Sequence, residues 1–131
     1  MSEMRKLTKY FCCLGGESGG RYDSHADEVF DDLFHKDVLI VGNAKTHNFD
    51  EWKDWYKRSI QDGLVFEMQK VVKTGPDSIV WTLLIHLENG TTLTHTAKGL
   101  FKDGKLIKTE PADPTVYDVM TKPKRKPVCI L

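Results

Sequence analysis

The sequence predicts an α+β protein, with helical patterns in its first half and strand patterns in its second half. Stretches with apolar residues at helical spacing precede residue 63. Between residues 79 and 108, runs rich in β-branched and aromatic residues alternate with the turn dipeptides Asn89-Gly90 and Asp103-Gly104. Strands joined by tight turns after a group of helices favour an antiparallel meander packed on those helices.

Two helices are predicted in the first 34 residues. Apolar side chains recur at helical spacing over residues 4–14, and Gly15-Gly16 ends this pattern. A second apolar stripe covers residues 26–34, and Ser24 before it has the capping-box spacing to Asp27. Each helix therefore has one apolar side that can pack against a sheet.

A short strand and a third helix are predicted next. Residues 37–41 are mostly apolar and β-branched, and Gly42-Asn43 ends the run. Asn48 and Glu51 have the spacing of another capping box and start a helix that Gly63 closes. Residues 64–73 then form a strand that leads into the meander.

The composition fits one folded domain, 1–113, followed by an irregular basic tail, 114–131. Nineteen basic and nineteen acidic residues cancel, so the chain has no overall electrostatic reason to bind nucleic acid. No apolar run approaches the length of a membrane span, and no signal peptide opens the chain. We therefore expect a cytoplasmic protein that neither spans a membrane nor binds nucleic acid.

The order of these elements resembles the nuclear transport factor two-like superfamily, and its SnoaL-like branch most closely. The resemblance is carried by Tyr10-Phe11, by residues 33–38, and by residues 99–107, where an aromatic residue precedes Lys-Asp-Gly-Lys. It covers about residues 4–113. It implies a curved antiparallel sheet wrapped around three N-terminal helices as a cone with an apolar cavity.

The resemblance implies no single reaction, because this fold serves isomerases, dehydratases, cyclases and binding modules without catalysis. Tyr10 falls where the steroid-isomerase branch keeps a tyrosine, but Gly42 and Ala97 replace its two carboxylates. Ketosteroid isomerisation is therefore not expected. Three functions stay open: binding of a small apolar or aromatic molecule in the cone, a cofactor-free lyase or isomerase reaction, and a dimerisation or adaptor module.

Two histidines on neighbouring predicted strands are the candidate acid–base groups. A two-residue turn at Asn89-Gly90 places His86 and His95 on one face of the hairpin. The resemblance implies that Phe101 points into the cone, so the face that carries His86 and His95 would point inward as well. An imidazole titrates near neutral pH, so His95, together with Tyr10, would be catalytic. The alternative is that His86 lies in solvent and His95 is hydrogen-bonded in the core.

Aromatic residues and side chains on the same predicted face supply the candidate ligand contacts. An aromatic wall over a flat ligand would be formed by Trp52, Trp55 and Tyr56, although aromatic residues at helical spacing are also typical of an ordinary core. No cofactor or metal is expected, because the two histidines lack a third ligand on their face. The ligand-binding candidates are Phe34, Trp52, Tyr56, Phe66, Met68, Thr82, His86 and Phe101.

The same strand predicts an interface on its other face. That face carries an apolar row that includes Trp81 and would lie outside the cone if His86 faces inward. Exposed apolar rows of this size mark contact surfaces. We therefore expect a homodimer that forms through the Trp81 face.

Overall fold

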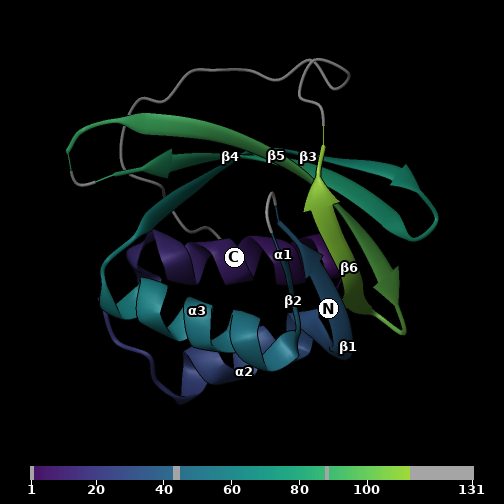
Figure 1. Ribbon diagram of the computed structural model, residues 1–131, viewed down its shortest axis with the longest axis horizontal. Helices are drawn as coiled ribbons and strands as arrows, with labels where there is room; N and C mark the ends of the chain where they lie inside the picture. Colours follow the sequence, from purple (N-terminus) through teal and green to yellow (C-terminus); the bar gives the residue numbers. More distant parts are fainter. Residues whose placement is uncertain (1, 43–44, 88, 113–131) are drawn as a thin grey trace.

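Three helices lie on the concave side of one curved, open, six-stranded sheet (Figure 1). The computed structural model describes residues 2–42, 45–87 and 89–112. The helices are α1 (Glu3–Cys12), which continues into a π-helical turn, η1 (Cys13–Glu17), then α2 (Ser24–Leu33) and α3 (Phe49–Gln61). This arrangement confirms the predicted α+β cone. The expected tail, 114–131, lies outside the described residues.

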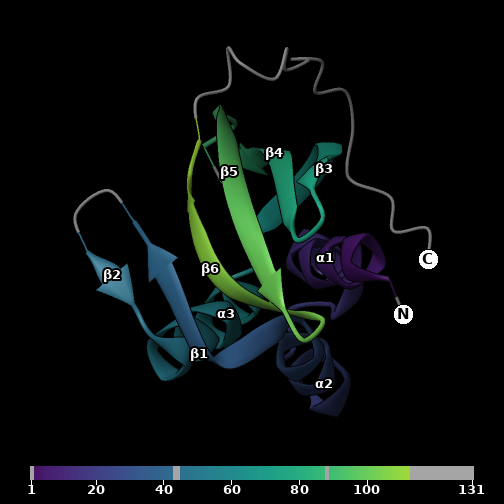
Figure 2. The same cartoon turned by 90° about the vertical axis from the view of Figure 1, so that its right-hand side faces the viewer.

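The strands follow the order β2-β1-β6-β5-β4-β3 across the sheet (Figure 2). Neighbouring strands run antiparallel except β1 and β6, which run parallel, so the sheet is mixed rather than antiparallel throughout. The strands are β1 (Phe34–Val41), β2 (Thr46–His47), β3 (Val65–Gly75), β4 (Ser78–His86), β5 (Thr92–Lys102) and β6 (Lys105–Pro111).

The helix starts follow the predicted chemistry, with one shift. Asn48 and Glu51 form a reciprocal capping box at the start of α3, as the sequence predicted. At α2 the capping side chain is Asp23, which accepts a hydrogen bond from the Ala26 amide, rather than Ser24. The Asp23 carboxylate stabilises the positive end of the helix as well as satisfying a free amide.

The turn between β4 and β5 differs from the predicted two-residue turn. The Leu87 amide donates to the Thr91 carbonyl across 2.9 Å, so three residues lie between the paired ends. Gly90 has a φ of 88°, the left-handed conformation that three-residue hairpin loops require. The extra loop residue shifts the pairing by one, so that Leu83, not Leu84, pairs with His95.

A shift of one residue reverses which face of β4 enters the cone. Trp81 pairs with Ala97, and their side chains share the concave face. Trp81 is buried in the core, where its ring centroid lies 6.3 Å from that of Phe11 on α1. The predicted dimer interface is therefore wrong, because Trp81 packs against α1 of its own chain and does not form an outer surface.

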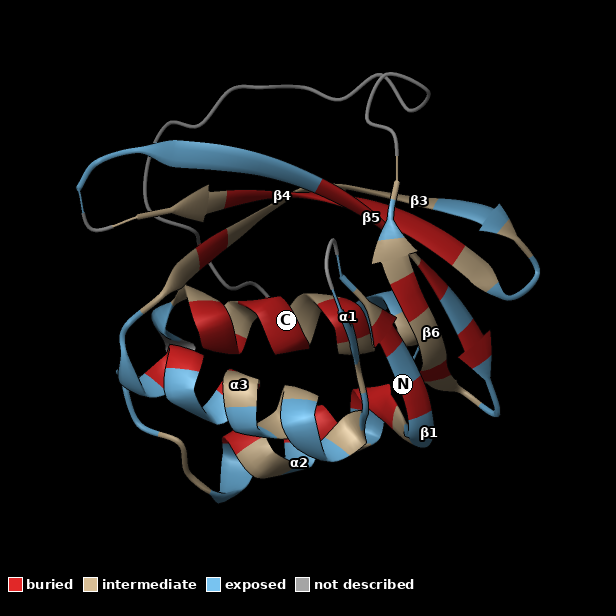
Figure 3. Ribbon diagram, viewed as in Figure 1, coloured by how far each residue is buried: buried red, intermediate tan, exposed pale blue. Residues whose placement is uncertain are grey.

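The burial pattern follows the concave face (Figure 3). The core joins apolar side chains of the three helices to the inner side of β4, β5 and β6. On the outer face, Thr82 and Thr96 are also buried, and their hydroxyls lie 3.2 Å apart. No helix among the described residues is long and apolar enough to cross a membrane.

A glycine makes room for the tryptophan at the centre of the sheet. A Cβ atom at Gly99 would lie 2.7 Å from Cζ3 of Trp81 and 2.6 Å from a methyl group of Leu106. Neither neighbour is a flexible chain end, since both are buried in the core. The Trp81 ring therefore occupies the space that any side chain at Gly99 would need.

We predict that Gly99→Ala lowers the free energy of unfolding by about 1–3 kcal/mol, because the added methyl group overpacks the core. Urea unfolding measures this change. Thr94→Ala, at an exposed position of the same strand, serves as the control and should change stability by no more than about 0.5 kcal/mol. Equal effects of the two substitutions would contradict the close contact with Trp81.

A lysine joins α2 to α3. Nζ of Lys53 lies 2.9 Å from a carboxylate oxygen of Asp27 and 2.8 Å from one of Asp31. The Tyr22 hydroxyl donates to Asp27 across 2.7 Å. The hydrogen bond from Tyr22 and then that from Lys53 lower the pKa of Asp27. The ionised carboxylate of Asp27 is thus favoured in the folded state.

Because the pKa of Asp27 is lowered on folding, its contribution to stability is present above the unfolded value of about 3.9 and is lost as the pH falls through the folded value. We predict that Asp27→Asn flattens the loss of stability below about pH 4. Urea unfolding at several pH values measures the slope. Asp54→Asn, which removes a surface pair with Arg58, is the control and should leave the slope nearly unchanged.

Candidate functional site

A cavity of about 290 Å³ lies between the concave face of the sheet and helices α1 and α3. It opens to solvent on one side, is lined by side chains from nearly every element, and most of its wall is apolar. The lining residues are Leu7, Tyr10, Phe11, Phe34, Ile40, Val41, Gly42, His47, Trp52, Trp55, Phe66, Trp81, Leu83, Ile85, His95, Ala97, Leu106, Thr109, Glu110 and Pro111.

The strand register explains the sheet side of this cavity. The inner residues of β4 include Trp81, Leu83 and Ile85, and those of β5 include His95 and Ala97. Ala97 is the smallest side chain among these five, and it lies directly across from Trp81. A large ring beside a methyl group leaves space that the helices do not fill.

All three tryptophans of the chain line the cavity. Trp52 and Trp55 on α3 are stacked, with ring centroids 4.3 Å apart and planes 15° apart. Phe66 meets Trp55 edge to face at 6.2 Å. Both α3 tryptophans are half-buried, so they lie between the interior of the cone and solvent.

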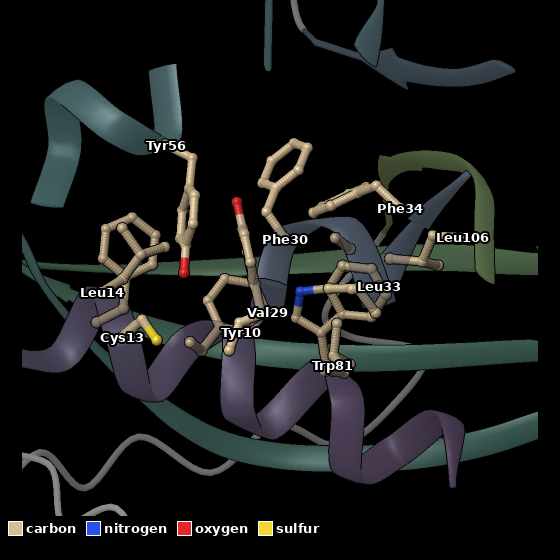
Figure 4. Close-up of a cluster of buried hydrophobic side chains, with 14 of the residues drawn as sticks. Tyr10, Cys13, Leu14, Val29, Phe30, Leu33, Phe34, Tyr56, Trp81 and Leu106 are labelled. Atoms are coloured by element: carbon tan, nitrogen blue, oxygen red, sulfur yellow. The ribbon is translucent and has the colours of Figure 1, made fainter. Parts of the chain in front are cut away.

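A buried hydroxyl without a hydrogen-bond partner belongs to the cavity wall. Tyr10 on α1 is 2 % exposed, and no described residue satisfies its hydroxyl by direct hydrogen-bond geometry. Its ring stacks on Tyr56 from α3 with centroids 4.7 Å apart, and Figure 4 shows the two hydroxyls at opposite ends of the pair. Burial raises the pKa of Tyr10, so the hydroxyl keeps its proton at neutral pH.

Two histidines lie among the lining residues. His95 on β5 is exposed and therefore lies at the mouth, but the surrounding protein lowers the pKa of its imidazole by desolvation. His47 on β2 is half-buried, and its ring centroid lies 5.6 Å from that of Trp52. A salt bridge of 3.2 Å between Lys45 and Glu51 joins the chain before β2 to the start of α3.

The cavity wall carries no fixed positive charge. Among the described residues that line it, none is lysine or arginine, although the chain has nineteen such residues. Glu110 is the one carboxylate among the described lining residues, and its Oε2 atom lies 3.7 Å from Nζ of Lys108. Nor do the described residues hold a cluster of three potential metal ligands.

The structure gathers half of the predicted site residues at this cavity. The predicted catalytic pair, His95 and Tyr10, both line it, and so do three predicted ligand contacts, Phe34, Trp52 and Phe66. His95 is more exposed than predicted, because it lies at the mouth rather than deep in the cone.

The other predicted contacts lie elsewhere. Thr82 and His86 are on the outer face of β4, because the shifted register turns them away from the cone. There His86 lies 3.1 Å from a carboxylate oxygen of Glu67. Tyr56 and Phe101 are core residues, and Met68 packs against the core from the concave face without lining the cavity.

Sequence reasoning missed His47 and the inner row of β4 as cavity residues, whereas Trp55 belonged to the predicted aromatic wall. Trp55 stands three residues after Trp52, a spacing that places both on one side of a helix. The nearly continuous apolar run of β4, which includes Trp81, is also the pattern of a strand that is buried on both faces. No local pattern marked His47, because β2 has only two residues and is placed by its pairing with β1.

The pKa of His95 is lowered on folding, so its neutral form is favoured in the folded state. Stability from this group is present above the unfolded value of about 6.5 and declines as the pH falls below it. We predict that an NMR titration places the His95 midpoint below that of the same residue in urea. Coinciding midpoints would contradict the desolvated position at the mouth.

Comparison with known proteins gives structural matches only. No sequence family and no curated protein matches the chain. A protein of unknown function from Cytophaga hutchinsonii superposes with a TM-score of 0.62 at 12% identity, over 90% of this chain and 96% of that one. A de novo designed protein of the same fold reaches 0.61 at 20% identity, over 90% of this chain and 92% of that one.

A third match is a Sinorhizobium meliloti protein provisionally assigned as a polyketide cyclase. It superposes with a TM-score of 0.56 at 16% identity, over 65% of this chain and 80% of that one. At these identities the matches establish architecture rather than activity. The helices, the curved sheet and these neighbours together show that the chain has the nuclear transport factor two-like fold.

Proposed function

We propose that this protein binds a small, largely apolar or aromatic molecule in the cone cavity, as proteins of the SnoaL-like branch do. The observation that carries the proposal is an apolar cavity of about 290 Å³ whose wall includes the unpaired Tyr10 hydroxyl. A buried hydroxyl without a partner is costly. A ligand with one polar group would offset that cost while filling the apolar space.

The volume limits the size of the ligand. It lies just below the range of about 300–1,000 Å³ typical of small-molecule sites. It is roughly twice the engineered cavity of about 150 Å³ that holds a single benzene. A molecule with one or two rings therefore fits the cavity better than a large polycyclic molecule.

Catalysis is the second candidate function, because His95 and Tyr10 line one cavity. A neutral imidazole at the mouth is able to accept a proton, and a protonated phenol inside is able to donate a hydrogen bond to a developing negative charge. A lyase or isomerase of this kind would lose turnover in both His95→Gln and Tyr10→Phe. It would keep turnover in His86→Gln, on the outer face of the sheet.

The cytoplasmic location and the homodimer stay predictions. Trp81 is enclosed by α1 and the sheet, so a dimer would need a surface other than the one predicted from the sequence. An adaptor function without a ligand is less favoured, because the cone is not filled by its own side chains.

We predict that 2-naphthol, a two-ring probe with one hydroxyl, binds the full chain in isothermal titration calorimetry and shifts the tryptophan emission. Ala97→Leu should weaken binding by about tenfold or more, because the larger side chain occupies the cavity. Thr94→Leu adds the same side chain at an exposed position of β5 and should bind as the wild type does. Absence of heat and of an emission shift in the wild type would contradict the proposal.

A further inference from the structure

We propose that the natural ligand is a small aromatic molecule bearing an ammonium group, held by the ring faces of the cavity. The inference rests on the proposed function and specifies its ligand class. It depends on three features of the described wall: its density of aromatic rings, its lack of lysine and arginine, and the buried Tyr10 hydroxyl.

Aromatic rings make up much of the wall. The three tryptophans and Tyr10 line the cavity together with phenylalanines from α1, β1 and β3. The face of an aromatic ring is negative, and a cation over it gains attraction that increases when water is excluded. Tryptophan binds cations best among these residues.

Cations already occupy the outer side of the same aromatic cluster. Nζ of Lys53 lies 5.8 Å from the ring centroid of Phe30 and 5.7 Å from that of Phe49. Nζ of Lys57 lies 5.8 Å from the ring of Tyr22, which meets Tyr56 edge to face. On the cavity side, by contrast, no lysine or arginine is among the described lining residues.

Charge inside the cavity favours a cation over an anion. An anionic ligand would meet no fixed positive charge among the described lining residues and would lose its hydration without compensation. The neutral imidazole of His95 does not repel a cation, since desolvation lowers its pKa. The buried Tyr10 oxygen presents a dipole, and it accepts a hydrogen bond from a ligand amine that carries N–H groups.

The test compares two probes of nearly identical shape on the full chain. Benzyltrimethylammonium carries the charge, and neopentylbenzene is its neutral carbon isostere. Transfer from water into an apolar cavity favours the neutral probe. Tighter binding of the charged probe would therefore report the attraction between the cation and the aromatic ring faces. We expect the ammonium probe to bind about tenfold more tightly, by the change in tryptophan emission at matched concentrations.

The outcomes separate the two proposals. Equal or tighter binding of neopentylbenzene would overturn the ammonium inference and leave the proposed cavity function standing. If neither these probes nor 2-naphthol bind, the proposed function fails and the ammonium inference fails with it. Tighter binding of the ammonium probe supports both.

A matched pair of variants on α3 locates the effect. Trp52→Leu removes a ring of the wall, whereas Phe49→Leu removes a ring that contacts Lys53 outside the cavity. The ratio of the two probes' affinities should fall about threefold in Trp52→Leu and stay unchanged in Phe49→Leu. A general loss of folding would weaken both probes alike and leave the ratio of their affinities unchanged, so a fall in this ratio reports the ring itself. An unchanged ratio in Trp52→Leu would overturn the role of the Trp52 ring.

Discussion

The contact between Trp81 and Gly99 determines how the sheet meets the helices. The bulky indole lies in the space that a side chain at Gly99, the diagonal neighbour of Trp81 on β5, would occupy. That contact in turn requires the register set by the loop before Thr91, since a one-residue slip would turn Trp81 outward. Core packing and hairpin geometry therefore support the same arrangement, and neither would be satisfied in the alternative register.

The cavity follows from the way large rings pack. Tyr10 from α1 and Tyr56 from α3 stack with ring centroids 4.7 Å apart, so aromatic rings fill the contact between these helices. The sheet curves over them, and the small Ala97 leaves the centre of its concave face unfilled.

Electrostatics divides the aromatic cluster into two sides. On the α2–α3 side, Lys53 pairs with Asp27 and Asp31 while lying over two phenylalanine rings. The cavity side has the Tyr10 hydroxyl and the His95 imidazole, whose pKa is lowered by desolvation, but no lysine or arginine among the described lining residues. The same rings therefore stabilise the fold on one side and present an electron-rich surface on the other.

The sequence by itself determined the three helices, the strands of the meander and the α3 capping box, and the family resemblance carried by its motifs determined the cone fold. These depend on local periodicity and on an ordered set of motifs, which short stretches of chain encode. The loop length between β4 and β5 was not determined, because Asn-Gly suits both two-residue and three-residue loops. Only tertiary structure decided the loop length, because Trp81 is buried beside Gly99 only when a three-residue loop pairs Trp81 with Ala97. The same packing placed His47 at the cavity and moved Thr82 and His86 away from it.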